Sequence, residues 1–97
     1  MATYITLANF TEQGIHSVKD TTKRATAVQE AAKKFGATMP QIYWTMGAYD
    51  LIAVVEAPDD LSASAFSLAI GMAGNIRGQT LRAFNKDEMN AVLSKLG

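Results

Sequence analysis

The sequence of 97 residues predicts an α+β domain, in which a four-stranded antiparallel sheet carries helices on one of its faces. Four stretches rich in β-branched, aromatic and aliphatic residues have the composition of strands. Two longer stretches between them have helical spacing and capping residues. Their order is strand, helix, strand, strand, helix, strand, and a short helix follows.

The first strand is predicted over residues 4–10, where Ile5 and Leu7 alternate with Tyr4 and Thr6. Successive side chains of a strand point to opposite faces, so these two pairs are expected on opposite faces of the sheet. The polar stretch Thr-Glu-Gln-Gly that follows is expected to end the strand in a loop.

The first long helix is predicted over Thr22–Phe35, with Thr21 as its N-cap and Gly36 at its C-terminal end. The second strand is predicted over Ile42–Met46, and Pro40, which has no backbone N–H, suits its beginning. The apolar face of the helix is formed by Ala25, Val28, Ala32 and Phe35.

The third strand, Leu51–Val55, follows a turn at residues 47–50 and is apolar on both faces, which is typical of an interior strand. Asp59 or Asp60 is expected to cap a second long helix that runs to about Ala73. Because apolar residues go nearly all round this helix, we expect more than one of its faces to be buried. These residues are Leu61, Ala65, Phe66, Leu68, Ala69, Ile70 and Met72.

The fourth strand is predicted over residues 76–84. Asn85 and Glu88, three residues apart, have the spacing of a capping box, which indicates that a helix begins there. The apolar residues of this short helix are Met89, Val92, Leu93 and Leu96.

This order, βαββαβ with a C-terminal helix, is that of the ferredoxin-like fold. The right-handed crossover rule places both long helices on the same face of the sheet. The other face would be exposed although the interior strand is apolar on both sides, and no further segment is predicted to cover it. We therefore expect a sheet-to-sheet homodimer, or a higher oligomer built from such dimers.

The length is that of a single domain over residues 1–97. Lys and Arg together number 9, as do Asp and Glu, so we expect no positive surface for nucleic acid. The absence of cysteine excludes disulfides and thiolate metal sites. No signal-peptide pattern is present, nor an apolar stretch of the ~20 residues that span a bilayer, so we expect a cytoplasmic protein without membrane contact.

Three segments, YITLANFTEQGIHSVKD, IYWTMGAYDLIAVVEAPDD and GNIRGQTLRAF, together resemble the GYD-domain family of small bacterial and archaeal proteins. The family motif stands here as Gly47-Ala48-Tyr49-Asp50, with one residue inserted. The resemblance covers essentially the whole chain, and it implies the ferredoxin-like fold and back-to-back sheet dimers of the dimeric α/β-barrel superfamily. That superfamily includes monooxygenases, haem-handling proteins, lyases and ligand-sensing domains, so it does not select a function.

Two interpretations of Gly47, Tyr49 and Asp50 remain open. They fit a turn, because glycine adopts positive φ and an aspartate bonds to its own turn backbone. They also fit the rim of a cavity, where the Tyr49 phenol beside a carboxylate could exchange a proton with a ligand.

Glu56 and His16 are the other candidates for chemistry. Glu56 shares a face with Ile52 and Val54, so it is expected to be a pocket acid, an exposed residue at the strand end, or the partner of Arg82 in an ion pair across the first strand. His16 is expected in the loop after the first strand, either solvated or acting as a general base or haem ligand.

We consider three hypotheses for function. The first is a small-ligand-binding or sensing homo-oligomer, with a small hydrophobic ligand in a pocket between sheet and helices. The second is an isomerase or a cofactor-independent monooxygenase with proton transfer by His16, Tyr49, Asp50 or Glu56, and the third is a structural assembly subunit. No cluster has metal-ligand spacing, and no cofactor is expected apart from the haem considered at His16. The expected ligand-binding residues are Tyr4, Thr6, Trp44, Tyr49, Glu56, Phe66 and Arg82.

Overall fold

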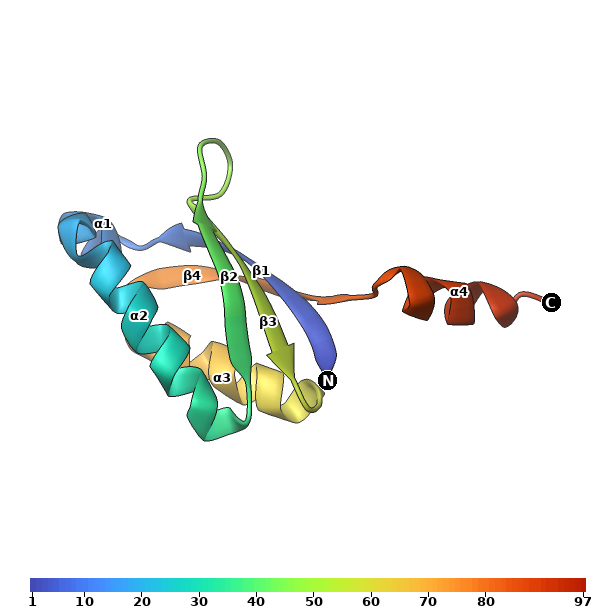
Figure 1. Ribbon diagram of the computed structural model, residues 1–97. Coiled ribbons are helices and arrows are strands. Elements are labelled where there is room, and N and C mark those ends of the chain that lie inside the picture. The colour runs from blue at the N-terminus through green and yellow to red at the C-terminus, as the bar shows by residue number, and fades with distance from the viewer.

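A computed structural model describes all residues, 1–97. The chain forms a four-stranded antiparallel sheet with two long helices against it and a third helix that stands away from it (Figure 1). This confirms the α+β class and the ferredoxin-like order of elements. The elements are β1 (Ala2–Phe10), α1 (Glu12–His16), a 3-10 turn (Val18–Asp20), α2 (Thr21–Ala32), a second 3-10 turn (Lys33–Phe35), β2 (Thr38–Trp44), β3 (Leu51–Ala57), α3 (Asp60–Met72), β4 (Ile76–Ala83) and α4 (Lys86–Ser94).

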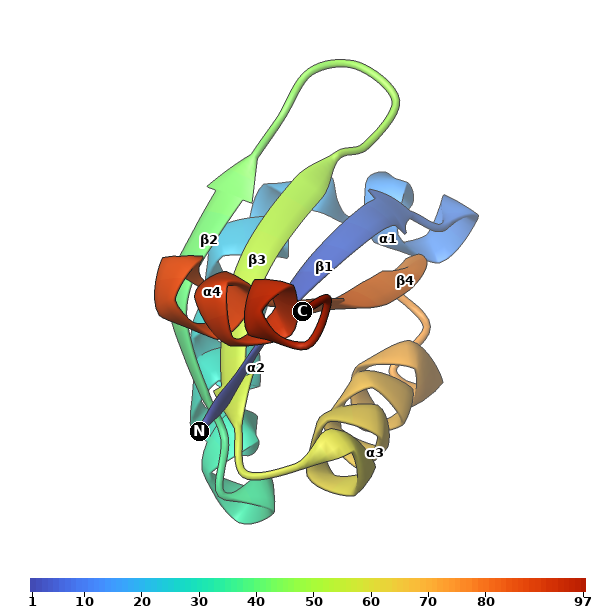
Figure 2. The ribbon, with the colours of Figure 1, turned by 90° about the vertical axis from the view of Figure 1, so that its right-hand side faces the viewer.

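The strand order is β2-β3-β1-β4, and every neighbouring pair is antiparallel. The apolar strand β3 is therefore interior, as predicted, and β2 and β4 form the two edges. Both α2 and α3 lie on one side of the sheet (Figures 1 and 2). The opposite side, which we call the open face, carries no helix of its own chain.

The register of the strands assigns each side chain to one of these two faces. One row across β3, β1 and β4 is Ala53, Thr6 and Thr80, and it faces the helices. The next row, Val54, Ile5 and Leu81, lies on the open face. The side chains of β1 therefore alternate between the two faces as the sequence predicts, with Tyr4 and Thr6 toward the helices and Ile5 and Leu7 on the open face. The large apolar residues of the open face are Ile5, Leu7, Tyr43, Ile52, Val54 and Leu81.

Residues 12–16 form the short helix α1, where the sequence predicts a loop. The Thr11 side chain caps α1 by accepting a hydrogen bond from the Gly14 backbone N–H at 3.1 Å. A Cβ on Gly14 would lie 1.9 Å from the Asn75 carbonyl oxygen, so only glycine allows α1 to pack this closely on the turn before β4. His16 consequently ends a helix, and the prediction of a loop there is wrong.

Several boundaries differ from those predicted, most clearly those of α2 and β2. The helix α2 begins at Thr21 after Asp20, and it gives way to a 3-10 turn that ends at Gly36, whose φ of 67° is left-handed. The strand β2 begins at Thr38, so Pro40 lies inside it. An edge strand tolerates proline, and the register shifts between Thr38 and Gln41, where the missing N–H would otherwise interrupt the ladder.

The core lies between the sheet and the two long helices. Phe66 of α3 is its largest fully buried side chain, and its ring centroid lies 5.8 Å from that of Phe35. Only Ala63 and Phe66 of α3 are buried. The prediction that more than one face of this helix is buried is therefore wrong for the single chain, because nothing lies on its outer side. The exposed apolar residues of α3 are Leu61, Leu68 and Met72, at 83%, 70% and 87%.

Candidate functional site

An apolar cavity of about 280 Å³ lies between the sheet and the helices α2 and α3. Its lining is mostly hydrophobic, with 16 of 20 residues of this kind. Both helices present alanines to the cavity, and these small side chains leave the space between helix and sheet unfilled. The alanines of the two helical segments that line it are Ala25, Ala27, Ala31, Ala69 and Ala73.

Polar groups in the cavity wall are few. Thr6 comes from the sheet, Thr21 and Arg24 from the start of α2, and Asn75 from the turn before β4. The guanidinium of Arg24 donates hydrogen bonds to the backbone oxygens of Ser17 at 2.7 Å and Gly14 at 3.1 Å. Arg24 thereby fixes the preceding segment against α2, and the cavity holds no carboxylate. Its chemistry suits a small apolar ligand with few polar atoms.

The predicted ligand-binding residues divide between several places. Thr6 and Phe66 line the cavity. Tyr4 and Arg82 face the same side of the sheet but line a neighbouring groove between α3 and β4. Trp44 lies beside α2, where its indole N–H donates to the Thr21 hydroxyl at 3.0 Å, and it does not line the cavity.

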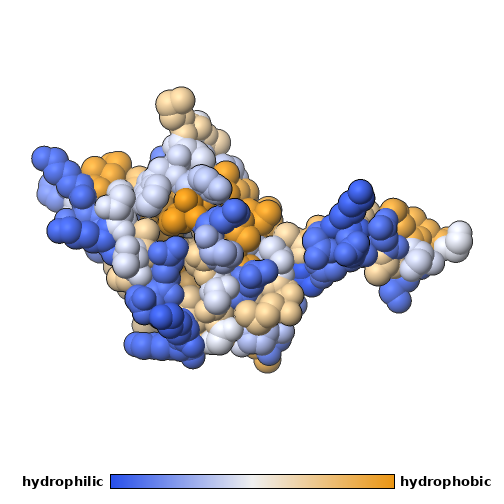
Figure 3. Space-filling model, viewed as in Figure 1, coloured by the Kyte–Doolittle hydropathy of each residue, from blue (hydrophilic) through white to orange (hydrophobic).

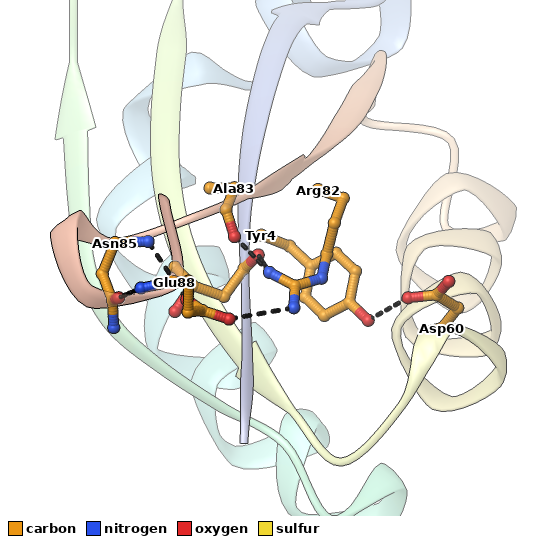
Figure 4. Close-up of polar contacts among 7 residues, drawn as sticks. Tyr4, Asp60, Arg82, Ala83, Asn85 and Glu88 are labelled. Carbon is orange, nitrogen blue, oxygen red and sulfur yellow. Dashed lines mark hydrogen bonds and ion pairs between the residues drawn. The ribbon is translucent and has the colours of Figure 1, made fainter. Parts of the chain in front are cut away.

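The groove contains a connected set of polar contacts (Figure 4). The buried Tyr4 phenol donates to the Asp60 carboxylate of α3 at 2.5 Å, and this hydrogen bond, followed by burial, raises the pKa of Tyr4. The Arg82 guanidinium lies 5.7 Å from the Tyr4 ring centroid and 4.7 Å from that of Phe84. It also forms an ion pair with Glu88 of α4 at 3.2 Å.

The predicted ion pair between Glu56 and Arg82 does not form. Glu56 is paired in register with Thr3, and Thr3 with Ala83, so Glu56 shares the open face with Ala83. Arg82 is one residue away along β4 and faces the helices, where Glu88 is its partner. The Glu56 residue is partly exposed, and its side chain forms no ion pair within the chain.

Tyr49 and Asp50 organise the connection between β2 and β3. The Asp50 carboxylate accepts from the Phe10 backbone N–H at 2.9 Å, and the Asp50 N–H donates to the Ala8 carbonyl oxygen, also at 2.9 Å. The Tyr49 hydroxyl accepts from the Gln79 side chain at 3.1 Å. Asp50 thus ties the hairpin to the end of β1, and its contacts account for it as a turn residue.

The four candidates for proton transfer are not brought together. His16 is exposed at the end of α1, and it lines neither the cavity nor the groove. Tyr49 and Glu56 are directed to the open face, whereas Asp50 is bonded to backbone groups. No group of three His, Asp or Glu side chains is close enough to hold a metal ion. None of these four side chains lines the cavity.

Fold and cavity together define a small ferredoxin-like protein with an apolar cavity and an uncovered sheet face. A sequence model of the GYD domain matches residues 4–93, and the chain belongs to this family. It is 31% identical over 84 residues, 86% of this chain and 88% of the other, to a protein of Thermus thermophilus named as a glutamine synthetase and cystathionine beta-lyase binding protein.

A crystal structure from Thermus thermophilus is similar in fold. It matches with a TM-score of 0.56 and 24% identity, over 88% of this chain and 95% of the other. No helix of the present chain is long and apolar enough to cross a membrane.

The contacts of Asp50 lead to a prediction about stability. Asp50→Ala removes the acceptor of the Phe10 N–H, and we expect it to lower the free energy of unfolding by about 1 kcal/mol. Asp20→Ala is the control, because Asp20 is exposed and its side chain makes no capping bond. Urea unfolding of both variants is the measurement. Equal stability of Asp50→Ala and the parent chain would contradict the role of Asp50 in the turn.

Proposed function

We propose that this protein is a homodimer that binds a small apolar ligand without catalysing a reaction on it. The observation that carries this proposal is the cavity of about 280 Å³ between α2, α3 and the sheet. That volume is close to the lower limit of about 300 Å³ that is typical of small-molecule sites. The separation of His16, Tyr49 and Glu56 from the cavity favours binding over proton-transfer catalysis.

The wall of the cavity supports a ligand of limited polarity. A hydroxyl from Thr6 or Thr21 and the amide of Asn75 could each form one hydrogen bond with it. Aliphatic side chains, together with Phe10 and Phe66, form most of the remaining surface. A compound about the size of indole, with one polar group, matches this lining.

Filling the cavity tests this proposal. Ala31→Leu adds three carbons to a residue that lines the cavity, whereas Ala65→Leu makes the same change on α3 at an exposed position outside it. We expect Ala31→Leu to abolish the thermal stabilisation that saturating indole gives, and Ala65→Leu to retain it. Indole titrations followed by calorimetric melts are the measurement. Equal stabilisation of both variants would show that indole does not occupy the cavity.

The homodimer is proposed from the open face. A monomer would expose Ile5, Ile52, Val54 and Leu81 to water on the face opposite the helices. Figure 3 shows exposed hydrophobic side chains over the sheet and again along α4. Packing two open faces together by a twofold axis would bury the apolar residues of both sheets in one self-complementary contact. This interface is apolar at its centre, as stable homodimer interfaces are.

A charge on the open face is expected to separate the dimer. Leu81 is 44% exposed in the single chain, so the monomer fold should tolerate Leu81→Asp, but the interface would bury an unpaired carboxylate. We expect the dimer dissociation constant to rise roughly 100-fold or more. The control, Thr80→Asp, lies on the same strand but faces the helices. Sedimentation equilibrium measures both variants, and an unchanged constant in Leu81→Asp would place the interface elsewhere.

A second candidate function is binding to a larger enzyme. It is favoured by the name of the Thermus thermophilus relative, which describes binding to glutamine synthetase and cystathionine beta-lyase. The outer side of α3 offers a surface for such a contact, because Leu61, Leu68 and Met72 are exposed there. This surface is separate from the open face, so a dimer could still use it.

Purified enzymes test this second candidate directly. Glutamine synthetase and cystathionine beta-lyase would each be immobilised, and binding of the chain measured by biolayer interferometry. We expect Leu68→Asp to weaken binding at least about tenfold, because the charge would be buried in the contact. Thr26→Asp, which places the same charge at an exposed position on α2 and outside this surface, is the control. If neither enzyme binds the unmodified chain, this candidate function is refuted.

A further inference from the structure

The helix α4 stands away from the rest of its own chain, to which the ion pair between Glu88 in its first turn and Arg82 ties it (Figure 1). It projects away from the sheet on the side of the open face (Figures 1 and 2). Its apolar residues have the spacing i, i+3, i+4, i+7 and therefore form one stripe. The stripe is Met89, Val92, Leu93 and Leu96, whose exposed fractions lie between 40% and 79%.

The direction of α4 is set by specific contacts at its beginning. The Asn85 side chain accepts from the Glu88 backbone N–H at 2.8 Å, and Glu88 accepts from the Asn85 N–H at 3.0 Å. Arg82 then ties Glu88 to β4. The hydrogen bond from Asn85, followed by that from Arg82, lowers the pKa of Glu88, so the carboxylate is charged at neutral pH. These contacts hold the first turn of α4 at the end of the sheet, so the rest of the helix, with its apolar stripe, extends away from the sheet.

A helix of this kind requires a surface to pack on. It has 9 residues, fewer than the roughly 12–15 that an isolated helix needs to be even marginally stable in water. Folding back onto its own sheet would require the contact between Arg82 of β4 and Glu88 of α4 to break. The surface must therefore come from another molecule that reaches the space in front of the open face.

We propose that α4 is an exchanged arm, which packs its stripe of Met89, Val92, Leu93 and Leu96 on a second copy of this chain. A copy docked on the open face by a twofold axis enters the space into which α4 projects, and its own α4 reaches back in the same way. Each subunit then contributes one arm, and the two arm contacts extend the interface between the sheets. This inference rests on the proposed homodimer and adds a second, separate contact to it.

Hydrogen exchange of the α4 amides tests the arm. In the dimer of the unmodified chain, the amides of residues 89–94 should exchange slowly. In the Leu81→Asp monomer they should exchange at nearly the rate of an unfolded peptide, while the amides of β1 and β3 remain protected. Rapid exchange of α4 in both proteins would mean that the arm is free. Slow exchange in both would mean that it packs on its own chain, and either result overturns the inference.

Substitutions on opposite sides of α4 give an independent measurement. Leu93→Asp places a charge within the stripe, and Ala91→Asp places the same charge on the opposite side of the helix. We expect Leu93→Asp to raise the dimer dissociation constant at least about tenfold and Ala91→Asp to change it by less than about twofold. A stable dimer with equal constants for the two variants would refute the arm and leave the sheet interface standing. An unmodified chain that stays monomeric at every concentration would refute both.

Discussion

The two-sided apolar strand β3 is the constraint on which the rest of the structure depends. Its residues alternate between Ala53 and Val55, which face the helices, and Ile52 and Val54, which face the other way. Two layers from one chain can bury only the first set, so the second set stays on a face that the chain does not cover. The uncovered sheet face and the proposed dimer are both consequences of this single pattern.

Arg82 shows how one residue can link separate parts of such a small protein. Its guanidinium covers the Tyr4 ring, whose hydroxyl bonds to Asp60 at the start of α3, and it also pairs with Glu88 at the start of α4. The helix-facing side of β4 therefore holds the first turn of both helices through one cluster of contacts. Because a guanidinium presents several donors in a fixed plane, a lysine would not reproduce this arrangement.

Local signals made most of the fold predictable. The interior position of β3 follows from its composition, the end of the α2 segment from Gly36, and the start of α4 from Asn85 and Glu88. The five-residue helix α1 was missed because a turn and a single helical turn share the same polar and glycine residues. The ion pair expected for Glu56 failed because a displacement of one residue in register places Arg82 on the other face.

The cavity could not be predicted because small residues create it. The expected ligand-binding residues are mostly aromatic or charged, and only Thr6 and Phe66 among them line the space. Alanine is a strong helix former and needs no function to explain its presence in α2. Its effect on packing depends on how far each helix lies from the sheet, which is a tertiary property that no local pattern encodes. The same reasoning applies to α4, whose amphipathic stripe predicts a packed helix but does not say on which molecule the packing occurs.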